Sequence, residues 1–410
     1  MVKIRNGIIG HIIYSTTSST FFFFFFFCFF SFITFLFPIN KPKTCVCQKK
    51  VVLLRIAYKK MWLILFLTLM LVFHHPAFGP HPFQRKSQDP VVLQSSHYIN
   101  GHFANEHPTP QFTGKNSSGL SALWNFLTDR TTERKPKKCV EIEKNDLSAL
   151  PLDKDWFVWF GHSSYLFSLG GQKILVDPVL QLEFPASVML KPFKGTDKYH
   201  PADLPEIDVL VITHEHWDHM DYATLRDIRE KVHHVICPLG IGAYLRYWGY
   251  ADEIITEMDW YQQTFISAPK TELSVTCLPT RHFSNRLFGA NQTLWSSFMI
   301  ENGDRRVYIG GDGGYDDRFS RIQQMFPSIS LAVLENGQYN PNWAYIHTLP
   351  EYLEKAMEDL QAENYITVHH DKFSLAPHAW DEPDKTVATL RSKHPDWSIL
   401  DQPLGSVIYY

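Results

Sequence analysis

A short string of histidines and carboxylates, placed directly after an apolar run, constrains this chain more than any other feature. Residues 209–213 are almost continuously apolar and lie between Pro205 and a polar cluster. A strand buried on both faces has this composition. The string His-Glu-His-Trp-Asp-His-Met-Asp follows at residues 214–221 and holds three histidines and three carboxylates. The combination predicts a polar site at the carboxyl end of a buried strand.

The spacing within the string indicates what this site binds. Side chains alternate along an extended chain, so His214 and His216 point the same way. Asp218 and His219 then turn toward a second, adjacent point. Imidazole and carboxylate are ligands that suit zinc, iron or manganese. The string therefore predicts a metal site.

From about Asp155 onward, short β-rich runs alternate with turns and helical patterns. We expect strands at residues 156–160, 165–169, 173–176, 209–213, 275–278, 297–300, 306–309, 331–334 and 365–368. We expect helices at residues 222–231, 240–248, 317–326, 350–360 and 385–392. This mixture predicts an α/β (α+β) fold in which helices cover two sheets, a four-layer αββα sandwich.

The N-terminal region has a different composition. Residues 21–37 are nearly all apolar and include seven consecutive Phe, whereas residues 62–73 form a shorter apolar run behind a basic flank. The shorter run has the layout of a signal peptide. We therefore expect a signal peptide or membrane anchor at 61–79 and an exported or membrane-associated protein. We hypothesise that translation starts near Met61, so that 1–60 is a Phe-rich, low-complexity extension of the gene model.

Composition narrows the remaining choices. Residues 80–150 are rich in Pro, His, Asn and Ser, which predicts an extended arm with one short helix near 120–127. Lys plus Arg is 39 and Asp plus Glu is 42, a balance that argues against a basic surface for nucleic acid. The six cysteines are scattered and form no disulfide framework. We interpret Cys237 and Cys277 as small core residues.

Several segments together resemble the metallo-β-lactamase superfamily. Besides the string at 214–219, they are Trp-Phe-Gly-His-Ser-Ser at 159–164, Leu-Val-Asp-Pro at 175–178 and Gly-Gly-Asp-Gly-Gly-Tyr at 310–315. They are similar to a branch that includes N-acylphosphatidylethanolamine phospholipase D and lactonase-like hydrolases. The similarity runs from near residue 103 to about residue 405, roughly three quarters of the chain. It implies a hydrolase domain of this fold at 151–410.

The resemblance also implies two zinc ions and the residues that hold them. His214, His216 and His282 would hold the first ion. Asp218, His219 and His369 would hold the second, and Asp312 would bridge both. The residues themselves place His282 after a strand, where ligands are usually presented. They place Asp312 among four glycines that permit close approach. His370 is the alternative to His369, and the choice rests on aligning Val368-His369 and Phe373 with the family pattern.

Further residues beside the seven ligands are expected to have roles at the site. The resemblance makes His347 a contact for substrate or leaving group. Tyr315 follows a matched motif and is expected either to line the pocket and bind substrate or to pack in the core. His162 and Asp177 lie at strand ends and are expected to hydrogen-bond metal ligands. The chain departs from the family in having Gly313 where Thr is common. It also has His-Asp-Lys at 370–372, where the phospholipase has Trp-Gly-Thr.

The implied chemistry is hydrolysis by metal-activated water, with Asp218 and Asp312 as catalytic residues. The leading prediction is a phospholipase D-type phosphodiesterase that acts on N-acylphosphatidylethanolamine-like lipids at a membrane surface, and a homodimer is compatible with it. One alternative is a lactonase-like metallohydrolase of a small soluble ester, and another is a non-catalytic metal-binding module. An apolar surface near the metals would favour the lipid, and a closed polar pocket with a phosphate-binding Arg would favour the soluble ester.

Overall fold

The computed structural model describes residues 58, 60–65, 74–80, 86–113, 128, 132–267, 272–284 and 290–410. The chain divides into two compact units, Met1–Leu71 and Val72–Tyr410. In the first unit, residues 60–65 are helical. Among the described residues, no helix is both long enough and apolar enough to cross a membrane. The predicted helix at 120–127 and the Phe-rich run at 21–37 lie outside the described residues.

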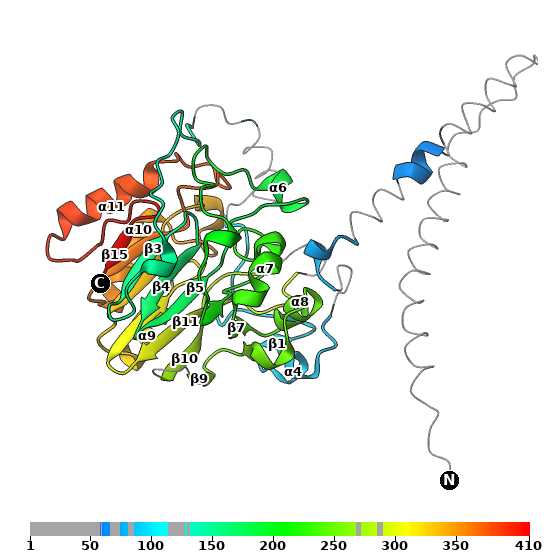
Figure 1. The fold of residues 1–410 in the computed structure, drawn as a ribbon, viewed down its shortest axis with the longest axis horizontal. Helices are drawn as coiled ribbons and strands as arrows, with labels where there is room; N and C mark the ends of the chain where they lie inside the picture. The colour runs from blue at the N-terminus through cyan, green and yellow to red at the C-terminus, as the bar shows by residue number, and fades with distance from the viewer. Residues whose placement is uncertain are drawn as a thin grey trace, which may run out of the picture. The chain divides into compact units, whose positions relative to one another are not determined.

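The second unit contains two large sheets (Figure 1). The seven-stranded sheet has the strand order β15 (Val407–Tyr409), β3 (Trp156–Trp159), β4 (Tyr165–Leu169), β5 (Gln172–Val176), β6 (Val209–Val211), β7 (Val235–Pro238) and β8 (Ile255–Met258). Its strands are antiparallel from β15 to β5 and parallel from β5 to β8. The parallel half places the end of β6 beside the end of β5, which positions the histidine string.

The six-stranded sheet has the order β14 (Tyr365–Val368), β13 (Leu331–Glu335), β12 (Arg305–Ile309), β11 (Ser296–Asn302), β10 (Glu272–Pro279) and β9 (Gln263–Ser267). Its strands are antiparallel from β9 to β12 and parallel from β12 to β14. The loops after β10, β12 and β14 carry His282, Asp312 and His369.

Alternating side chains divide the core of the six-stranded sheet into two layers. In β12, Val307 and Ile309 join the central cluster that contains residues of both sheets, whereas Tyr308 points to the other face. There Tyr308 belongs to a cluster with apolar residues of the covering helices α9 (Arg318–Met325), α10 (Pro350–Leu360) and α11 (Glu382–Lys393). Helices α7 (Tyr222–Ile228) and α8 (Gly242–Tyr247) lie on the other side of the sandwich (Figure 1). The predicted four-layer αββα architecture is confirmed.

Most expected elements have bounds close to those observed, and β4, β14 and α10 match residue for residue. Four strands of the two large sheets were not predicted: the buried strand β7 and the three edge strands β8, β9 and β15. Most residues of the three edge strands are only half-buried or exposed, so these strands lack the sustained apolar run on which the prediction depended. The arm contains α4 (Pro90–Gln94) and a small hairpin of β1 (Tyr98–Ile99) and β2 (His102–Phe103).

Candidate metal centre

The structure brings the seven predicted ligand side chains together at one place. His214, His216 and His282 form one group whose ligand atoms lie within 4.8 Å of one another. Asp218, His219 and His369 form a second such group, together with His162. These side chains come from segments up to 155 residues apart in the chain, since the first is His214 and the last His369. Their convergence is the geometry that a metal centre requires.

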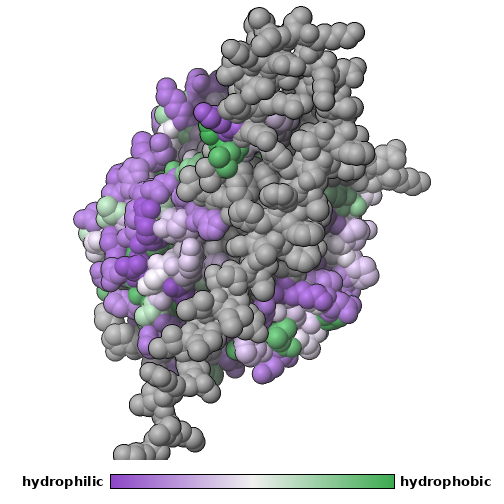
Figure 2. Space-filling view, turned by 90° about the vertical axis from the view of Figure 1, so that its right-hand side faces the viewer, coloured by the Kyte–Doolittle hydropathy of each residue, from purple (hydrophilic) through white to green (hydrophobic). Residues whose placement is uncertain are grey.

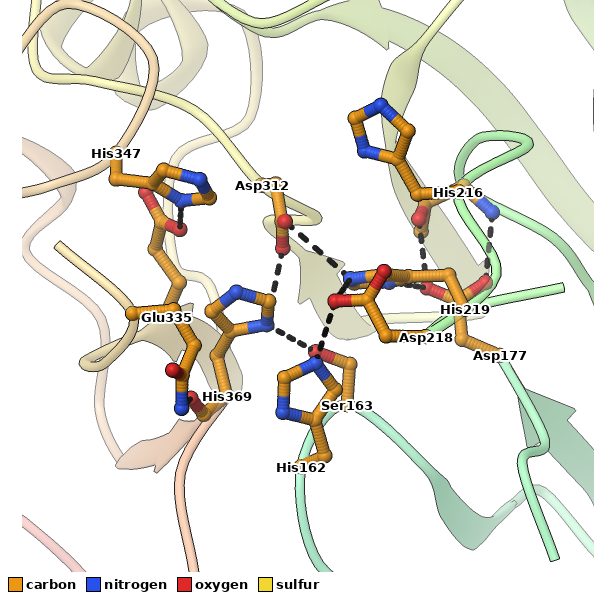
Figure 3. A network of polar contacts seen from close by, with 12 residues as sticks. His162, Ser163, Asp177, His216, Asp218, His219, Asp312, Glu335, His347 and His369 are labelled. Atoms are coloured by element: carbon orange, nitrogen blue, oxygen red, sulfur yellow. Dashed lines mark hydrogen bonds and ion pairs between the residues drawn. The ribbon is translucent and has the colours of Figure 1, made fainter. Parts of the chain in front are cut away.

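Asp312 lies between the two groups (Figure 3). Its Oδ2 atom is 3.2 Å from His219 Nε2 and 3.8 Å from the Nε2 atoms of His214 and His282. Its Oδ1 atom is 3.3 Å from His369 Nδ1. The carboxylate therefore faces ligands of both groups, which is the position that a bridging residue occupies.

The donor set fits bound cations. His216 Nδ1 lies 2.9 Å from His214 Nε2 and 3.2 Å from His282 Nε2. A neutral imidazole has one N–H, so three ring nitrogens that face one point need a proton or cation among them. His219 Nε2 and Asp312 Oδ1 are also buried without a hydrogen-bond partner. Buried polar atoms are rarely left so, and a metal ion would satisfy them.

The electrostatics of the centre also favour a cation. Burial and the neighbouring imidazoles hold the pKa of His214 and His282 well below the ordinary value, which keeps these rings in the neutral form that binds metal. Burial also lowers the pKa of His369, and the positive charge that His162 can carry lowers it further. Burial raises the pKa of Asp312 to about 6. A divalent cation would offset that burial and favour the ionised carboxylate.

Two residues predicted to contact ligands lie against them. Asp177 Oδ2 accepts from His219 Nδ1 at 2.8 Å, so the other ring nitrogen of His219 faces the centre. Thr213 N and Oγ1 donate to the same carboxylate at 2.8 and 2.6 Å. His162 Nε2 donates to Asp218 Oδ2 at 2.9 Å (Figure 3). These contacts fix the tautomer of one ligand and the orientation of another.

His347 lies beside the ligands, held by a residue that the sequence did not indicate. Its Nδ1 donates to Glu335 Oε2 at 2.9 Å (Figure 3). Its ring centre is 5.1 Å from that of His282 and 5.5 Å from that of His369. Glu335 is 4% exposed and its Oε1 accepts from Gly313 N and Thr348 N. A carboxylate at the end of the apolar strand β13 was the signal that sequence reasoning missed.

The structure does not bring Tyr315 to the ligands. Its ring stacks between Phe319 and Tyr352, and its hydroxyl donates to Asp359 Oδ2 at 2.7 Å. The predicted pocket contact is therefore replaced by packing among the covering helices. His370 also lies outside the two groups, because its ring packs on Trp159 at 4.7 Å.

Two departures from the family pattern have structural reasons. A side chain at Gly313 would place Cβ 2.0 Å from Thr280 Oγ1, so the Thr common in the family does not fit here. Lys372 is buried, and its Nζ donates to Phe160 O at 3.2 Å and to Val179 O at 2.7 Å. It ties the segment after His369 to the seven-stranded sheet.

Comparison with known proteins identifies the family. The family described as beta-lactamase superfamily domain matches residues 172–370. An uncharacterised protein of Mycobacterium tuberculosis is 34% identical over 319 residues, which cover 74% of this chain and 82% of that protein.

Two further relatives are named as N-acyl-phosphatidylethanolamine-hydrolyzing phospholipases D. The Caenorhabditis elegans protein is 29% identical, over 53% of this chain and 64% of its own length. The mitochondrial Saccharomyces cerevisiae protein is 30% identical, over 61% of this chain and 54% of its own length. This chain is thus a hydrolase of the metallo-β-lactamase superfamily, whose fold implies metal ions, and it is similar to the N-acylphosphatidylethanolamine phospholipases D.

Proposed function

We propose that this hydrolase is a di-zinc phosphodiesterase of phospholipase D type, which releases an N-acylethanolamine and phosphatidic acid from N-acylphosphatidylethanolamine-like lipids. The relatives named above support the reaction. An apolar surface beside the metal centre supports the lipid substrate, and it is the observation that carries the proposal. We further propose that residues 61–79 bring the protein to a membrane, where this substrate is found.

The apolar surface is formed by α6 (Ala186–Met189) and by Phe184, which lies two residues before the helix. Phe184, Val188 and Met189 are 45%, 63% and 69% exposed. Lys191 and Lys194 are exposed just beyond the helix. Figure 2 shows that hydrophobic residues are scattered in small groups among hydrophilic ones on the face that it views. Apolar side chains flanked by lysines fit an anionic phospholipid surface.

This surface is coupled to the centre through one packed layer. Ala186 and Leu190 pack with Phe373, and Trp217 of the histidine string packs against the same cluster. The ring of Phe373 lies 5.1 Å from that of His162, which holds Asp218. A lipid held at α6 would therefore lie near the ligands, among which Asp218 is partly exposed.

The chain's own residues account for the proton transfers that the reaction needs. Bound metal ions would supply Lewis acidity and lower the pKa of water toward about 7. As the water oxygen forms its bond to phosphorus, Asp218, oriented by His162, takes the proton that this water loses. As the P–O bond breaks, its electron pair goes to the leaving oxygen of the N-acylethanolamine. His347, held at Nδ1 by Glu335, gives that oxygen a proton from Nε2.

A hydrolysis assay with a substrate panel tests the proposal. The full chain, stripped with a chelator and reloaded with zinc, is assayed on N-acylphosphatidylethanolamine vesicles, a fatty-acyl lactone and soluble bis(4-nitrophenyl) phosphate. We expect zinc-dependent cleavage of both phosphodiesters. Cleavage of the lactone alone would establish the soluble-ester alternative, and zinc binding without any cleavage would establish a binding module.

A surface variant tests the lipid contact separately. Replacing Phe184, Val188 and Met189 with Ser should lower turnover on vesicles at least about tenfold, because tenfold corresponds to roughly 1.4 kcal/mol and two buried CH₂ groups at roughly 0.8 kcal/mol each already reach that value. Turnover of the soluble phosphodiester should not change. Phe265→Ser, at a side chain on β9 that is 60% exposed, is the matched control. Equal loss on both substrates would contradict a docking role for α6.

A further inference from the structure

The arm that precedes the sandwich reaches the metal centre at Asn105. Its Nδ2 donates to the carbonyl oxygen of His282 at 2.8 Å, and its Oδ1 accepts from the backbone N–H of His282 at 3.2 Å. The two residues are 177 positions apart in the chain. One side-chain amide thus satisfies both backbone polar groups of a predicted metal ligand.

His282 needs such a partner because it stands outside the sheet. Strand β10 ends at Pro279, so the ladder with β11 gives His282 no hydrogen bond. His282 is 1% exposed, and a buried backbone N–H or C=O without a hydrogen-bond partner lowers the stability of the fold. The ring is held separately, since Nδ1 donates to Ile346 O at 2.8 Å. Two distant segments therefore fix the backbone and the ring of the same ligand.

The amide of Asn105 is itself fixed in orientation. Trp295 Nε1 donates to Asn105 Oδ1 at 3.0 Å and to Thr280 O at 3.0 Å. Because an indole N–H only donates, this bond assigns Oδ1 as the oxygen and leaves Nδ2 to face His282 O. Thr280 Oγ1 in turn donates to Asp312 O at 2.7 Å. The network links the arm to two predicted ligands.

We propose that Asn105 is a positioning residue for the metal ligand His282. The arm then helps to build the metal centre, because it supplies the side chain that holds the backbone of this ligand. The proposal rests on the proposed role of His282 as a ligand. Asn is suited to this position because its amide offers one donor and one acceptor side by side, which matches the two backbone groups. Neither Asp nor Ala provides both.

Other contacts hold the arm in place without Asn105. Glu106 Oε2 accepts from Arg321 at 2.8 Å, and its Oε1 accepts from the hydroxyl of Tyr261 at 2.7 Å. Phe103 is fully buried, and its N–H donates to Asn291 O. A substitution at Asn105 should therefore loosen His282 while the arm stays bound.

The test measures metal binding to the full chain by competition with a chromophoric zinc chelator. Losing a residue that orients a ligand typically weakens metal affinity 10–100-fold. We expect Asn105→Ala to lower the affinity for one of the two zinc ions by this factor and to leave the affinity for the other ion unchanged. His282→Ala should affect the same ion more strongly. Glu106→Gln, which alters the neighbouring arm contact, should bind zinc like the wild-type chain.

Asn105→Asp keeps the acceptor for Trp295 and the His282 N–H but removes the donor to His282 O, so it serves if Asn105→Ala does not fold. Wild-type zinc affinity in a folded Asn105→Ala or Asn105→Asp chain would overturn the inference, as would equal weakening in Glu106→Gln. A wild-type chain that binds zinc without cleaving phosphodiesters would overturn the proposed function alone. A wild-type chain that binds no zinc would overturn both.

Discussion

The two sheets of the sandwich supply the predicted metal ligands in different ways. The seven-stranded sheet supplies four of them from a single loop, residues 214–219 after β6. The six-stranded sheet supplies the other three, one after each of β10, β12 and β14. One half of the centre is therefore local in sequence, and the other half depends on the relative placement of three strands.

The residues that hold the ligands differ in the same way. His219 and Asp218 are held by Asp177 and His162, which belong to the seven-stranded sheet and its loops. On the other side, the backbone of His282 is held by the arm, and His369 Nδ1 lies 2.8 Å from Ser163 Oγ of the opposite sheet. The comparison teaches that the ligands of the seven-stranded sheet are held by residues of the same sheet and its loops. The ligands of the six-stranded sheet are held by residues from other parts of the molecule.

Removing the residue that faces both groups of ligands should have the largest effect. Asp312 is the ligand candidate that faces both groups, so Asp312→Asn should lose metal and activity together. We expect turnover to fall by at least about 10³-fold, since the electrostatic stabilisation of the transition state is lost. Zinc content and turnover are measured on the same preparation, with the exposed Asp317→Asn as control. Full turnover in a zinc-free Asp312→Asn chain would refute the metal mechanism.

Glu335→Gln should separate catalysis from metal binding in the second half. The Gln oxygen can keep the bonds from Gly313 N and Thr348 N, but its NH₂ then faces His347 Nδ1, and the negative charge of Glu335 that helps to raise the pKa of His347 is lost. We expect turnover to fall about 10²-fold, within the usual range for general acid catalysis, with zinc content unchanged.

Substrates with different leaving groups test whether Glu335 acts through proton transfer. The loss should be larger for an alkyl phosphodiester than for bis(4-nitrophenyl) phosphate, because nitrophenolate leaves without a proton. His347→Gln should show the same preference, and the double variant should be little worse than either single one, since the two residues act as a unit. Additive losses, or equal losses on both substrates, would count against the pair.

How much the sequence predicted follows the same division. The string at 214–219 combined an apolar strand with alternating ligands, so local pattern alone indicated a metal site there. His282, Asp312 and His369 carry no comparable local pattern, and they were assigned through the family resemblance. Strands β4 and β14 and helix α10 were predicted residue for residue, because their apolar runs have clear ends.

The residues that sequence reasoning missed act over long distances. Asn105 and Glu335 reach their partners through the tertiary fold, and a lone Asn in an arm or a Glu after a strand has no periodicity to mark it. Tyr315 shows a different case, since its place next to a matched motif left both a pocket contact and a core position open. Its ring packs between covering helices, because helix α10 supplies both a stacking partner and a hydroxyl acceptor.

The smallest effect should come from loosening the internally braced half. Asp177→Asn keeps the shape of the side chain, but an NH₂ at Oδ2 no longer accepts from His219 Nδ1 or Thr213 Oγ1. We expect about tenfold weaker binding of one zinc ion, at the low end for residues that orient ligands, and near-normal turnover at saturating zinc. The ion affected should differ from the one that Asn105→Ala weakens, and the double variant should weaken both. If both single variants weaken the same ion, the residue that holds His219 and the residue that holds His282 do not act on separate ions, and the comparison fails.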